Sequence, residues 1–166
     1  MKKILYLFLA LASYGIFAQT TAEAYLNSAV SKFYLDDMKG AIVDYTKAII
    51  IDPSYVEAYR KRGLAKEELK DFSGAIVDYT KAIEIDPNYA FALHDRGITK
   101  GKLKDFSGAI ADYSRAIKID PNYATAYFNR GVSKFYLGDM IGACKDARKA
   151  QELGDDASIL IKKACN

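Results

Sequence analysis

Apolar residues recur every three or four positions through most of the chain, and the pattern repeats every 34 residues. The segments 70–90 and 104–124 are identical at 17 of 21 positions. Within them, residues such as Ala109, Tyr113 and Ala116 have the spacing that places side chains on one helix face. Pro is disfavoured inside a helix. The chain's three Pro residues share one phase of the period and therefore mark helix boundaries: Pro53, Pro87 and Pro121.

Each period is predicted to form a pair of helices. In the third period we expect the first helix to begin at Asp86–Pro87, with Asp86 as N-cap and Pro87 in the first turn. A break follows at Lys104–Asp105, and Asp105 is predicted to cap the second helix. One helix pair cannot bury its apolar face alone, so neighbouring pairs are expected to stack and bury a shared core.

The recurring residues resemble the tetratricopeptide repeat family, in an exported form of bacterial type. The motif of this family is a 34-residue helix pair with a Gly in the first helix, an Ala and an aromatic residue in the second, and a late Pro. The first period has Ala29 in place of the Gly, and the fourth has Ala147 in place of the aromatic residue, as is common in terminal repeats. The two middle periods match the motif at Gly63, Ala75, Tyr79 and Pro87 and at Gly97, Ala109, Tyr113 and Pro121.

The resemblance implies an all-α fold. We expect a right-handed α-solenoid of four helix-turn-helix repeats and a C-terminal capping helix. The predicted bounds are 22–55, 56–89, 90–123 and 124–157 for the repeats and 158–166 for the capping helix.

The first 18 residues follow a different pattern. Lys2 and Lys3 precede an apolar run from Ile4 to Ala12, and Ala18 is a small residue of the kind that precedes a cleavage site. The run is short for a transmembrane helix, which needs about 20 residues. We therefore expect a signal peptide over residues 1–18, cleaved near Ala18, and an extracytoplasmic chain, periplasmic or secreted, with no membrane span. Retention of the segment as an N-terminal anchor is the alternative.

The charge balance argues against a nucleic-acid partner. The chain has 24 Lys and Arg against 21 Asp and Glu. Loss of Lys2 and Lys3 with the signal peptide would leave 22 basic residues, a net charge near +1, with both signs interspersed. A nucleic-acid-binding domain would favour a basic patch.

No group of residues in the sequence predicts catalysis, a metal or a cofactor. His94 is the only histidine, so a metal site would lack partners, and we expect His94 to be an ordinary groove residue. The Gly residues are scattered at the repeat spacing rather than clustered in a phosphate-binding loop. The acidic pairs Asp36–Asp37 and Asp155–Asp156 are predicted to be helix caps. The chain is therefore predicted not to be an enzyme.

A set of charged residues also recurs with the repeat. Arg and Lys lie four positions apart on the first helices, and an Asp recurs on the second helices. We expect a ladder of ion pairs between helices, each contributing about 0–1 kcal/mol at the surface. The residues are Arg62, Arg96 and Arg130, Lys66, Lys100 and Lys134, and Asp44, Asp78, Asp112 and Asp146.

By the same resemblance, the first helices line a concave groove. We predict a protein-protein interaction scaffold that binds a peptide or a segment of a partner protein there, within an envelope-associated complex. The alternative is a structural protein that self-assembles through its terminal helices, as a homo-oligomer. The predicted groove residues are Leu26, Val30, Phe33, Tyr34, Arg60, Lys61, Leu64, Phe91, His94, Asp95, Ile98, Phe128, Asn129, Val132, Phe135 and Tyr136.

Some family members clamp the C-terminal carboxylate of chaperones with Lys and Asn on successive first helices. Here Leu26 and Val30, or Arg60 and Leu64, stand at those positions. The clamp is therefore predicted to be absent, and the sequence does not identify the partner.

The two cysteines of the chain are predicted to form a disulfide. Export implies an oxidising compartment, where two thiols commonly pair. Cys144 lies on the second helix of the fourth repeat, and Cys165 follows a short helix in the position of an absent fifth repeat. Ile159 and Leu160 on that helix would cover the open end of the core. Two separate buried thiols are the alternative.

Overall fold

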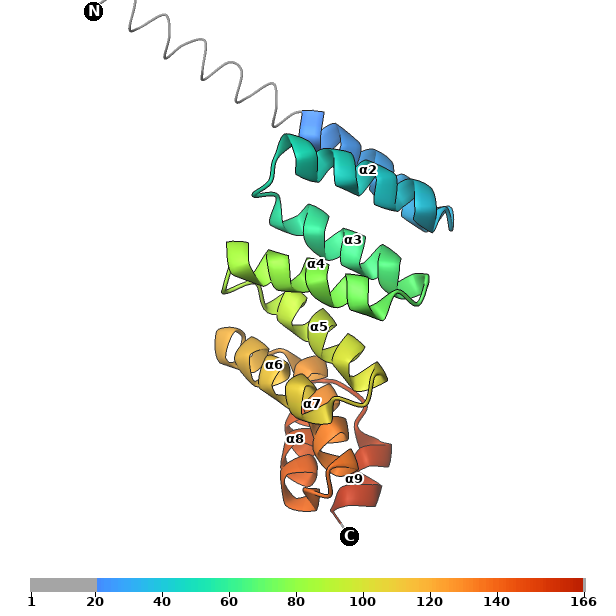
Figure 1. Cartoon of the computed structure of the whole chain (residues 1–166). Coiled ribbons are helices and arrows are strands. Elements are labelled where there is room, and N and C mark those ends of the chain that lie inside the picture. The colour runs from blue at the N-terminus through green and yellow to red at the C-terminus, as the bar shows by residue number, and fades with distance from the viewer. Residues whose placement is uncertain (1–20, 166) are drawn as a thin grey trace, which may run out of the picture. The chain divides into compact units, whose positions relative to one another are not determined.

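The computed structural model describes residues 21–165, and every regular element in that range is an α-helix. The predicted signal peptide, residues 1–18, lies outside the described residues. The chain divides at Asp71–Phe72 into two compact units. Figure 1 shows the helices in chain order from blue to red. Within residues 21–165, no helix is both long and apolar enough to cross a membrane.

The first unit contains the helix over residues 21–34, α2 (Met38–Ile51) and α3 (Val56–Glu68). A short turn joins the helix over residues 21–34 to α2, so the two are antiparallel, and α3 packs against α2. Small side chains let these helices approach closely, and Tyr45 fills the space between them. The fully buried small residues of this core are Ala29, Ala41, Ala48, Ala58 and Ala65.

The second unit contains six helices that pack in chain order, each against the next. In addition, α5 contacts α7, and α7 contacts α9, so the first helices of successive pairs lie side by side. The first and second helices of the third and fourth pairs are therefore arranged as predicted for tetratricopeptide repeats, with α9 as the cap. The helices are α4 (Phe72–Ile85), α5 (Ala90–Lys102), α6 (Phe106–Ile119), α7 (Ala124–Tyr136), α8 (Met140–Glu152) and α9 (Ser158–Ala164).

Close packing in the second unit requires glycine at one position of the first helices. A Cβ on Gly97 of α5 would lie 2.6 Å from the ring of Tyr113 on α6. A Cβ on Gly131 of α7 would lie 3.1 Å from the side chain of Leu160 on α9. By contrast, a Cβ on Gly101, one turn after Gly97, would meet nothing within 4 Å. Only the first two of these glycines are therefore explained by a close approach.

Aspartates cap the second helices, as predicted for Asp105. The carboxylates of Asp37, Asp105 and Asp139 each accept a hydrogen bond of 2.9 Å from the backbone N–H three residues later. This satisfies one of the N–H groups that a helix N-terminus leaves unpaired. The pair Asp155–Asp156 does not provide the N-cap of α9, which is Ala157, although the Asp156 carboxylate accepts from the N–H of Ser158. Asp36 is not a cap either and lies in the turn before α2.

The prediction for Asp86 and Pro87 is wrong. α5 begins at Ala90, with Tyr89 as its N-cap residue. Asp86 instead accepts the N–H of Asn88 through its side chain and the N–H of Tyr89 through its carbonyl. These bonds make a tight turn in which Pro87 occupies the second position, where its fixed φ is favourable. The Asp-Pro sequence thus ends one helix and forms the turn before the next.

The turn inside each helix pair contains a residue in the left-handed region. The φ values are 64° at Asp36, 63° at Lys70, 64° at Lys104 and 83° at Gly138. In the third pair, the N–H of Lys104 donates to the carbonyl of Gly101, and that of Asp105 donates to the carbonyl of Lys100, both at 2.9 Å. This double hydrogen bond is the Schellman motif, which usually has glycine at the left-handed position.

Candidate functional site

The predicted groove residues lie on the first helices, which belong to both units. In the first unit, Leu26 is 6% exposed and is part of the core. Val30 and Phe33 pack against the same core, whereas Tyr34 is 82% exposed. Arg60, Lys61 and Leu64 on α3 are half-buried. Of the predicted groove residues on the helix over 21–34, only Tyr34 is therefore broadly accessible to a partner.

In the second unit, the predicted residues of α5 separate into two groups. Phe91 is 53% exposed, and Ile98 is half-buried. His94 and Asp95 are each only 8% exposed. The side chain of His94 therefore belongs mainly to the packing between helices, and its assignment to the groove stays a prediction.

His94 connects α5 to α6, to α7 and to the turn before α7. Its ring centroid lies 4.8 Å from that of Tyr123 and 5.7 Å from that of Tyr113. Its Nε2 is 3.1 Å from the Nδ2 of Asn129, which can donate a hydrogen bond to it. The carboxylate of Asp95 lies 3.5 Å from Nδ1. Within residues 21–165 no group of three His, Cys, Asp or Glu side chains is placed to hold a metal ion, so a structural role fits His94 better.

All the predicted residues of α7 except Asn129 form one wall of an apolar pocket. The pocket has a volume of about 230 Å³, and α9 with the residues before it forms the other wall. Asp156 and Lys163 place one negative and one positive charge among otherwise apolar and aromatic side chains. The lining residues are Phe128, Val132, Phe135, Tyr136, Asp156, Ile159, Leu160 and Lys163.

Four of these lining residues were not predicted as groove residues: Asp156, Ile159, Leu160 and Lys163. The sequence did contain a signal for three of them, since Ile159, Leu160 and Lys163 stand at first-helix positions of an incomplete fifth repeat, and Asp156 lies in the turn before it. Leu160 covers the core as predicted and is 6% exposed, but Ile159 is 71% exposed. The expectation that Ile159 covers the core is therefore wrong, and its side chain is accessible at the pocket.

Aromatic side chains continue from this pocket along α7. The ring of Tyr136, which is 63% exposed, stacks on Phe106 at 4.8 Å with an interplanar angle of 8°. Phe91 on α5 contacts Tyr123 edge to face at 5.7 Å. Aromatic rings with accessible faces are common anchors in protein interfaces, and Phe91 and Tyr136 are the most exposed of the predicted groove residues in this unit.

The recurring ion pairs are buried, which corrects the expectation of surface pairs. The four aspartates are between 1% and 3% exposed. Arg96 donates to both carboxylate oxygens of Asp112, from Nε at 2.9 Å and from Nη2 at 2.6 Å, and Lys100 donates to Asp112 at 2.7 Å. Arg130 and Lys134 bind Asp146 in the same way. These groups hold α5 to α6 and α7 to α8.

In the first pair, the buried aspartate is neutralised without an arginine. The carboxylate of Asp44 accepts from the Oγ of Ser28 at 2.8 Å, from Lys32 and, at 3.0 Å, from Lys47. The hydrogen bond from Lys32 is the main cause that lowers the pKa of Asp44 from 3.8 to about 2, against the opposing effect of burial. Asp44 is therefore held in its charged form.

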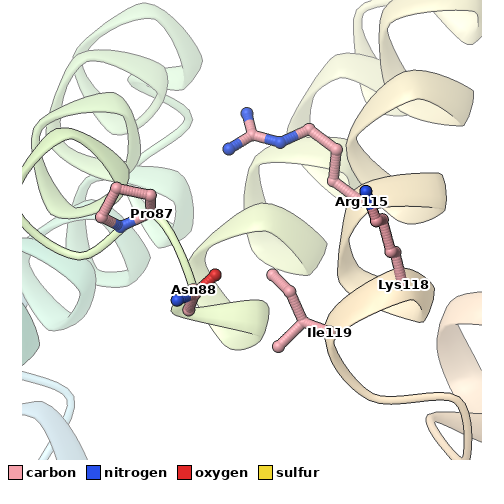
Figure 2. Close-up of a pocket in the computed structure, with 5 residues that line it drawn as sticks. All are labelled: Pro87, Asn88, Arg115, Lys118 and Ile119. Atoms are coloured by element: carbon pink, nitrogen blue, oxygen red, sulfur yellow. The ribbon is translucent and has the colours of Figure 1, made fainter.

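A second, larger hollow is lined by no residue of a described first helix. It has a volume of about 630 Å³ and is formed by the turn between α4 and α5 and by the end of α6. Figure 2 shows the guanidinium of Arg115 extending toward the Pro87 side of this hollow. The lining residues, all exposed, are Pro87, Asn88, Arg115, Lys118 and Ile119.

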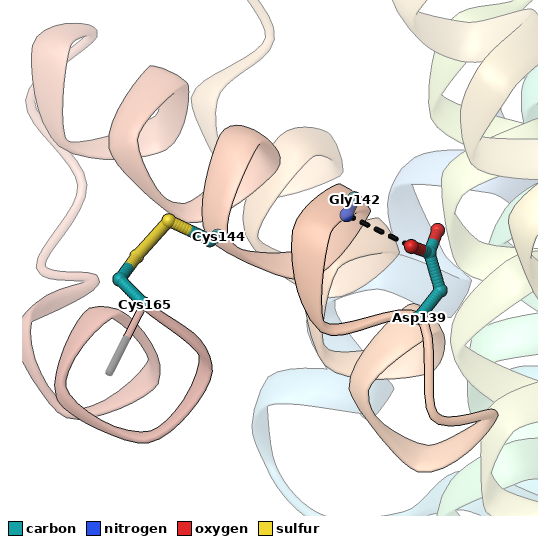
Figure 3. Close-up of a disulfide and its surroundings, with 4 residues drawn as sticks. All are labelled: Asp139, Gly142, Cys144 and Cys165. Carbon is teal, nitrogen blue, oxygen red and sulfur yellow. Dashed lines mark hydrogen bonds between the residues drawn. A yellow bond between two sulfur atoms is a disulfide. The ribbon is translucent and has the colours of Figure 1, made fainter.

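The predicted disulfide between Cys144 and Cys165 is present. It joins α8 to the residue that follows α9, with a Cα–Cα distance of 5.0 Å. Figure 3 shows the bridge beside the Asp139 cap at the start of α8. Because α9 has only seven residues and a helix this short is marginal alone, the bridge helps to keep α9 against α7, where it completes the apolar pocket.

Comparison with protein families identifies the repeats. Tetratricopeptide repeat models match residues 22–55 and 56–89, and a TPR repeat model matches residues 102–138. Together these segments cover more than half of the chain. No curated protein matches the sequence.

Several solved structures are similar to this chain. A crystal structure of MamA protein is 26% identical and has a TM-score of 0.80, with 87% of this chain and 80% of that chain covered. MamA residues 41 to the end from Desulfovibrio magneticus RS-1 are 19% identical, with a TM-score of 0.75 over 81% and 76%. The first TPR of Spaghetti (RPAP3), bound to the HSP90 peptide SRMEEVD, is 25% identical, with a TM-score of 0.70 over 72% and 95%.

Proposed function

The chain belongs to the tetratricopeptide repeat family of protein-protein interaction scaffolds, which are typically non-catalytic, and from this premise we propose that its first helices bind an extended segment of a partner protein. The observation that carries the proposal is the apolar pocket between α7 and α9. One apolar side chain of the partner would be anchored there, and the neighbouring residues of the partner would lie along α7 and α5.

The size and lining of the pocket favour a single side chain. Pockets for drug-sized molecules measure about 300–1,000 Å³, whereas this one measures about 230 Å³. Phe128, Phe135 and Ile159 offer an apolar surface to an aromatic or branched residue. Asp156 and Lys163 can pair with charged or backbone groups on either side of that residue, which would fix the direction of the bound segment.

The similarity to the Spaghetti TPR supports a peptide as the ligand, since that protein is solved with a bound peptide. The ligand of the present chain should differ from a chaperone tail. A clamp for a terminal carboxylate needs cations, but Leu26 is buried in the core and Asp95, which is acidic, is nearly buried on α5. We therefore place the main anchor in the apolar pocket and not at a carboxylate.

We also propose that the chain is exported and acts in an envelope-associated complex. The sequence of residues 1–18 has the form of a signal peptide, and a disulfide between the only two cysteines suits an oxidising compartment. Expression of the full chain in a Gram-negative host, followed by intact-mass measurement of the periplasmic fraction, tests this. A mass equal to that of a chain that begins at Gln19 supports export. An uncleaved chain that is found only in the cytoplasm contradicts it.

Two exposed isoleucines provide a matched test of the binding site. Ile159 lies at the pocket on α9 and is 71% exposed, whereas Ile141 lies on α8 and is 87% exposed. Twelve-residue peptides selected from a random phage library on the purified chain would be labelled and titrated by fluorescence polarisation. We expect the selected peptides to share an aromatic or branched apolar residue. Ile159→Glu should weaken their binding at least tenfold, and Ile141→Glu should change it less than twofold.

The opposite pattern would contradict the proposal. If Ile141→Glu abolishes binding and Ile159→Glu does not, the partner uses α8. If no peptide is enriched and sedimentation shows concentration-dependent oligomers that Ile141→Glu disrupts, self-assembly through the terminal helices is the better description of the protein.

A further inference from the structure

The end of α6 differs in charge from the equivalent helices. In α4, Lys81 pairs with Glu84 three residues later at 3.1 Å. In α8, Lys149 pairs with Glu152 at the same distance. The equivalent residues of α6 are Arg115 and Lys118, so two cations replace a cation and an anion one turn apart.

These two cations have no partner within residues 21–165. Neither Arg115 nor Lys118 forms an ion pair or a side-chain hydrogen bond there. The equivalent Lys47 of α2 also has an acidic partner, Asp44, whereas Asp112, one turn before Arg115, is occupied by Arg96 and Lys100. α6 is thus the one described second helix in which this recurring cation is left without an anion.

The unpaired cations border the larger hollow. Figure 2 shows Arg115 reaching across it toward the turn that carries Pro87 and Asn88, with Lys118 and Ile119 on the same helix as Arg115. Asp86 and Asp120, which adjoin Pro87 and Ile119 in the sequence, accept the N–H groups of Asn88 and Asn122 in their own turns. The hollow therefore combines two cations, one amide side chain and the apolar side chains of Pro87 and Ile119.

The helix dipole does not account for this charge pattern. A cation in the last turn of a helix is stabilised by about 0.3–1 kcal/mol, which is a sufficient reason for Lys118 alone. However, α4 and α8 carry Glu84 and Glu152 at that position, so the fold does not require a cation there. Two like charges one turn apart are also unfavourable by themselves.

We propose that this hollow binds the carboxylate side chains of an acidic segment of a partner protein. Arg115 can bind a carboxylate through two parallel hydrogen bonds, Lys118 adds a second cation, and the Asn88 amide can donate a further hydrogen bond. Ile119 and Pro87 supply apolar contacts for the methylene groups of Glu. The site lies on the α4–α5 turn and α6, so it is separate from the α7–α9 pocket and does not depend on the function proposed for that pocket.

The test uses a fluorescein-labelled decamer of glutamate, titrated with the purified full chain by fluorescence polarisation at low salt. Lys118→Glu gives α6 the charge arrangement of α4 and α8 and is expected to fold as they do. Lys39→Glu makes the same change of net charge at an exposed position of α2. We expect Lys118→Glu and Arg115→Gln to weaken binding at least tenfold and Lys39→Glu to change it less than twofold.

A second readout locates the bound peptide. In ¹⁵N-resolved NMR spectra, the side-chain signals of Asn88 and the Nε signal of Arg115 should shift with the glutamate decamer and remain unchanged with a lysine decamer. The proposal is overturned if Lys118→Glu binds like the wild type, or if Lys39→Glu weakens binding as much, which would indicate attraction by net charge alone. It is also overturned if millimolar inorganic phosphate displaces the peptide, because the hollow would then be a site for small anions. Binding of the selected apolar peptides, and its loss in Ile159→Glu, are measured in a separate experiment. Failure of one proposal can therefore be told apart from failure of the other.

Discussion

The first helix pair and the later pairs bury an aspartate at the same position but neutralise it differently. Asp44 is held by Ser28, Lys32 and Lys47. Asp112 is held by a bidentate arginine, Arg96, and by Lys100. Both carboxylates are almost fully buried, so the choice between serine and arginine cannot be explained by the solvation of the acid.

The difference is explained by what else the arginine contacts. Arg96 uses its third nitrogen, Nη1, to donate to the hydroxyl of Thr80 on the preceding α4 at 3.0 Å. Arg130 does the same to Ser114 on α6 at 3.1 Å, so each of these arginines joins three helices. Ser28 is too short to do this, and the described residues contain no helix pair before it. The arginine therefore connects neighbouring repeats, in addition to neutralising the acid.

Removal of the arginine should have the largest effect on stability. Arg96→Leu would leave Asp112 buried with Lys100 alone and would break the link to Thr80, so we expect a loss of about 3–5 kcal/mol in the free energy of unfolding. Ser28→Ala should cost only about 1 kcal/mol, because Lys32 and Lys47 still bind Asp44. Urea unfolding followed by circular dichroism measures both. Equal losses of unfolding free energy in the two variants would contradict the conclusion that the arginine, unlike Ser28, also connects neighbouring repeats.

Removal of the disulfide should have the next largest effect on stability, and this effect should be confined to the second unit. A bridge across 21 residues contributes about 3 kcal/mol in the loop-entropy model. Cys144→Ser with Cys165→Ser should therefore expose the hydrogen-bonded amides of α9, such as that of Ile161, to faster hydrogen exchange. The amide of Tyr45 in the first unit should be unaffected and serves as the internal control. Unchanged exchange in α9 would show that packing alone holds this helix.

The repeat period was sufficient to predict the helix pairs and the Asp105 cap, and it contributed the positions of the two cysteines to the disulfide prediction. A period of 34 residues defines which positions are equivalent, and the short helix and Cys165 follow from the same frame. The Asp86 prediction failed because an Asp-Pro sequence satisfies two local rules, a helix N-cap and a turn. The two are distinguished by where the next helix begins. Because α5 begins at Ala90, Asp86 lies too far before it to be its N-cap and forms a turn instead.

The binding surface was harder to predict. Equivalent positions on the first helices are assigned to the groove by resemblance, but burial depends on the size of the neighbours. His94 is covered because Tyr113 and Tyr123 pack on its ring, and Ile159 is exposed because α9 has no partner helix beyond it among the described residues. The arginine link between repeats was also missed, since the sequence pattern gives no distance between Arg96 and Thr80.

A smaller effect should appear at low pH in the first unit. The lowered pKa of Asp44, about 2 instead of 3.8, means that its charged form stabilises the fold. This stabilisation is complete above about pH 5 and is lost as the pH falls through 2. We expect a loss of about 1–2 kcal/mol, because Lys32 and Lys47 are partly exposed and their pairs are screened by solvent. Asp44→Asn should remove this part of the pH dependence from urea unfolding measured between pH 5 and pH 2, and an unchanged slope would contradict the assignment.

The smallest effect compares the same turn in the third and fourth pairs, where Lys104 and Gly138 have φ values of 64° and 83°. A left-handed conformation costs an L-residue about 1 kcal/mol, whereas glycine adopts it freely but loses more entropy on folding. We therefore expect Lys104→Gly to stabilise the chain by about 0.5 kcal/mol and Gly138→Lys to destabilise it by about as much. For a chain of this size, such changes shift the thermal midpoint by about 1–2 °C in opposite directions. A Cβ on Gly138 would meet nothing within 4 Å, so a steric clash would not obscure the backbone term. If Lys104→Gly lowers the midpoint instead, the Lys104 side chain must contribute contacts that outweigh its backbone strain, and the two turns would not be equivalent.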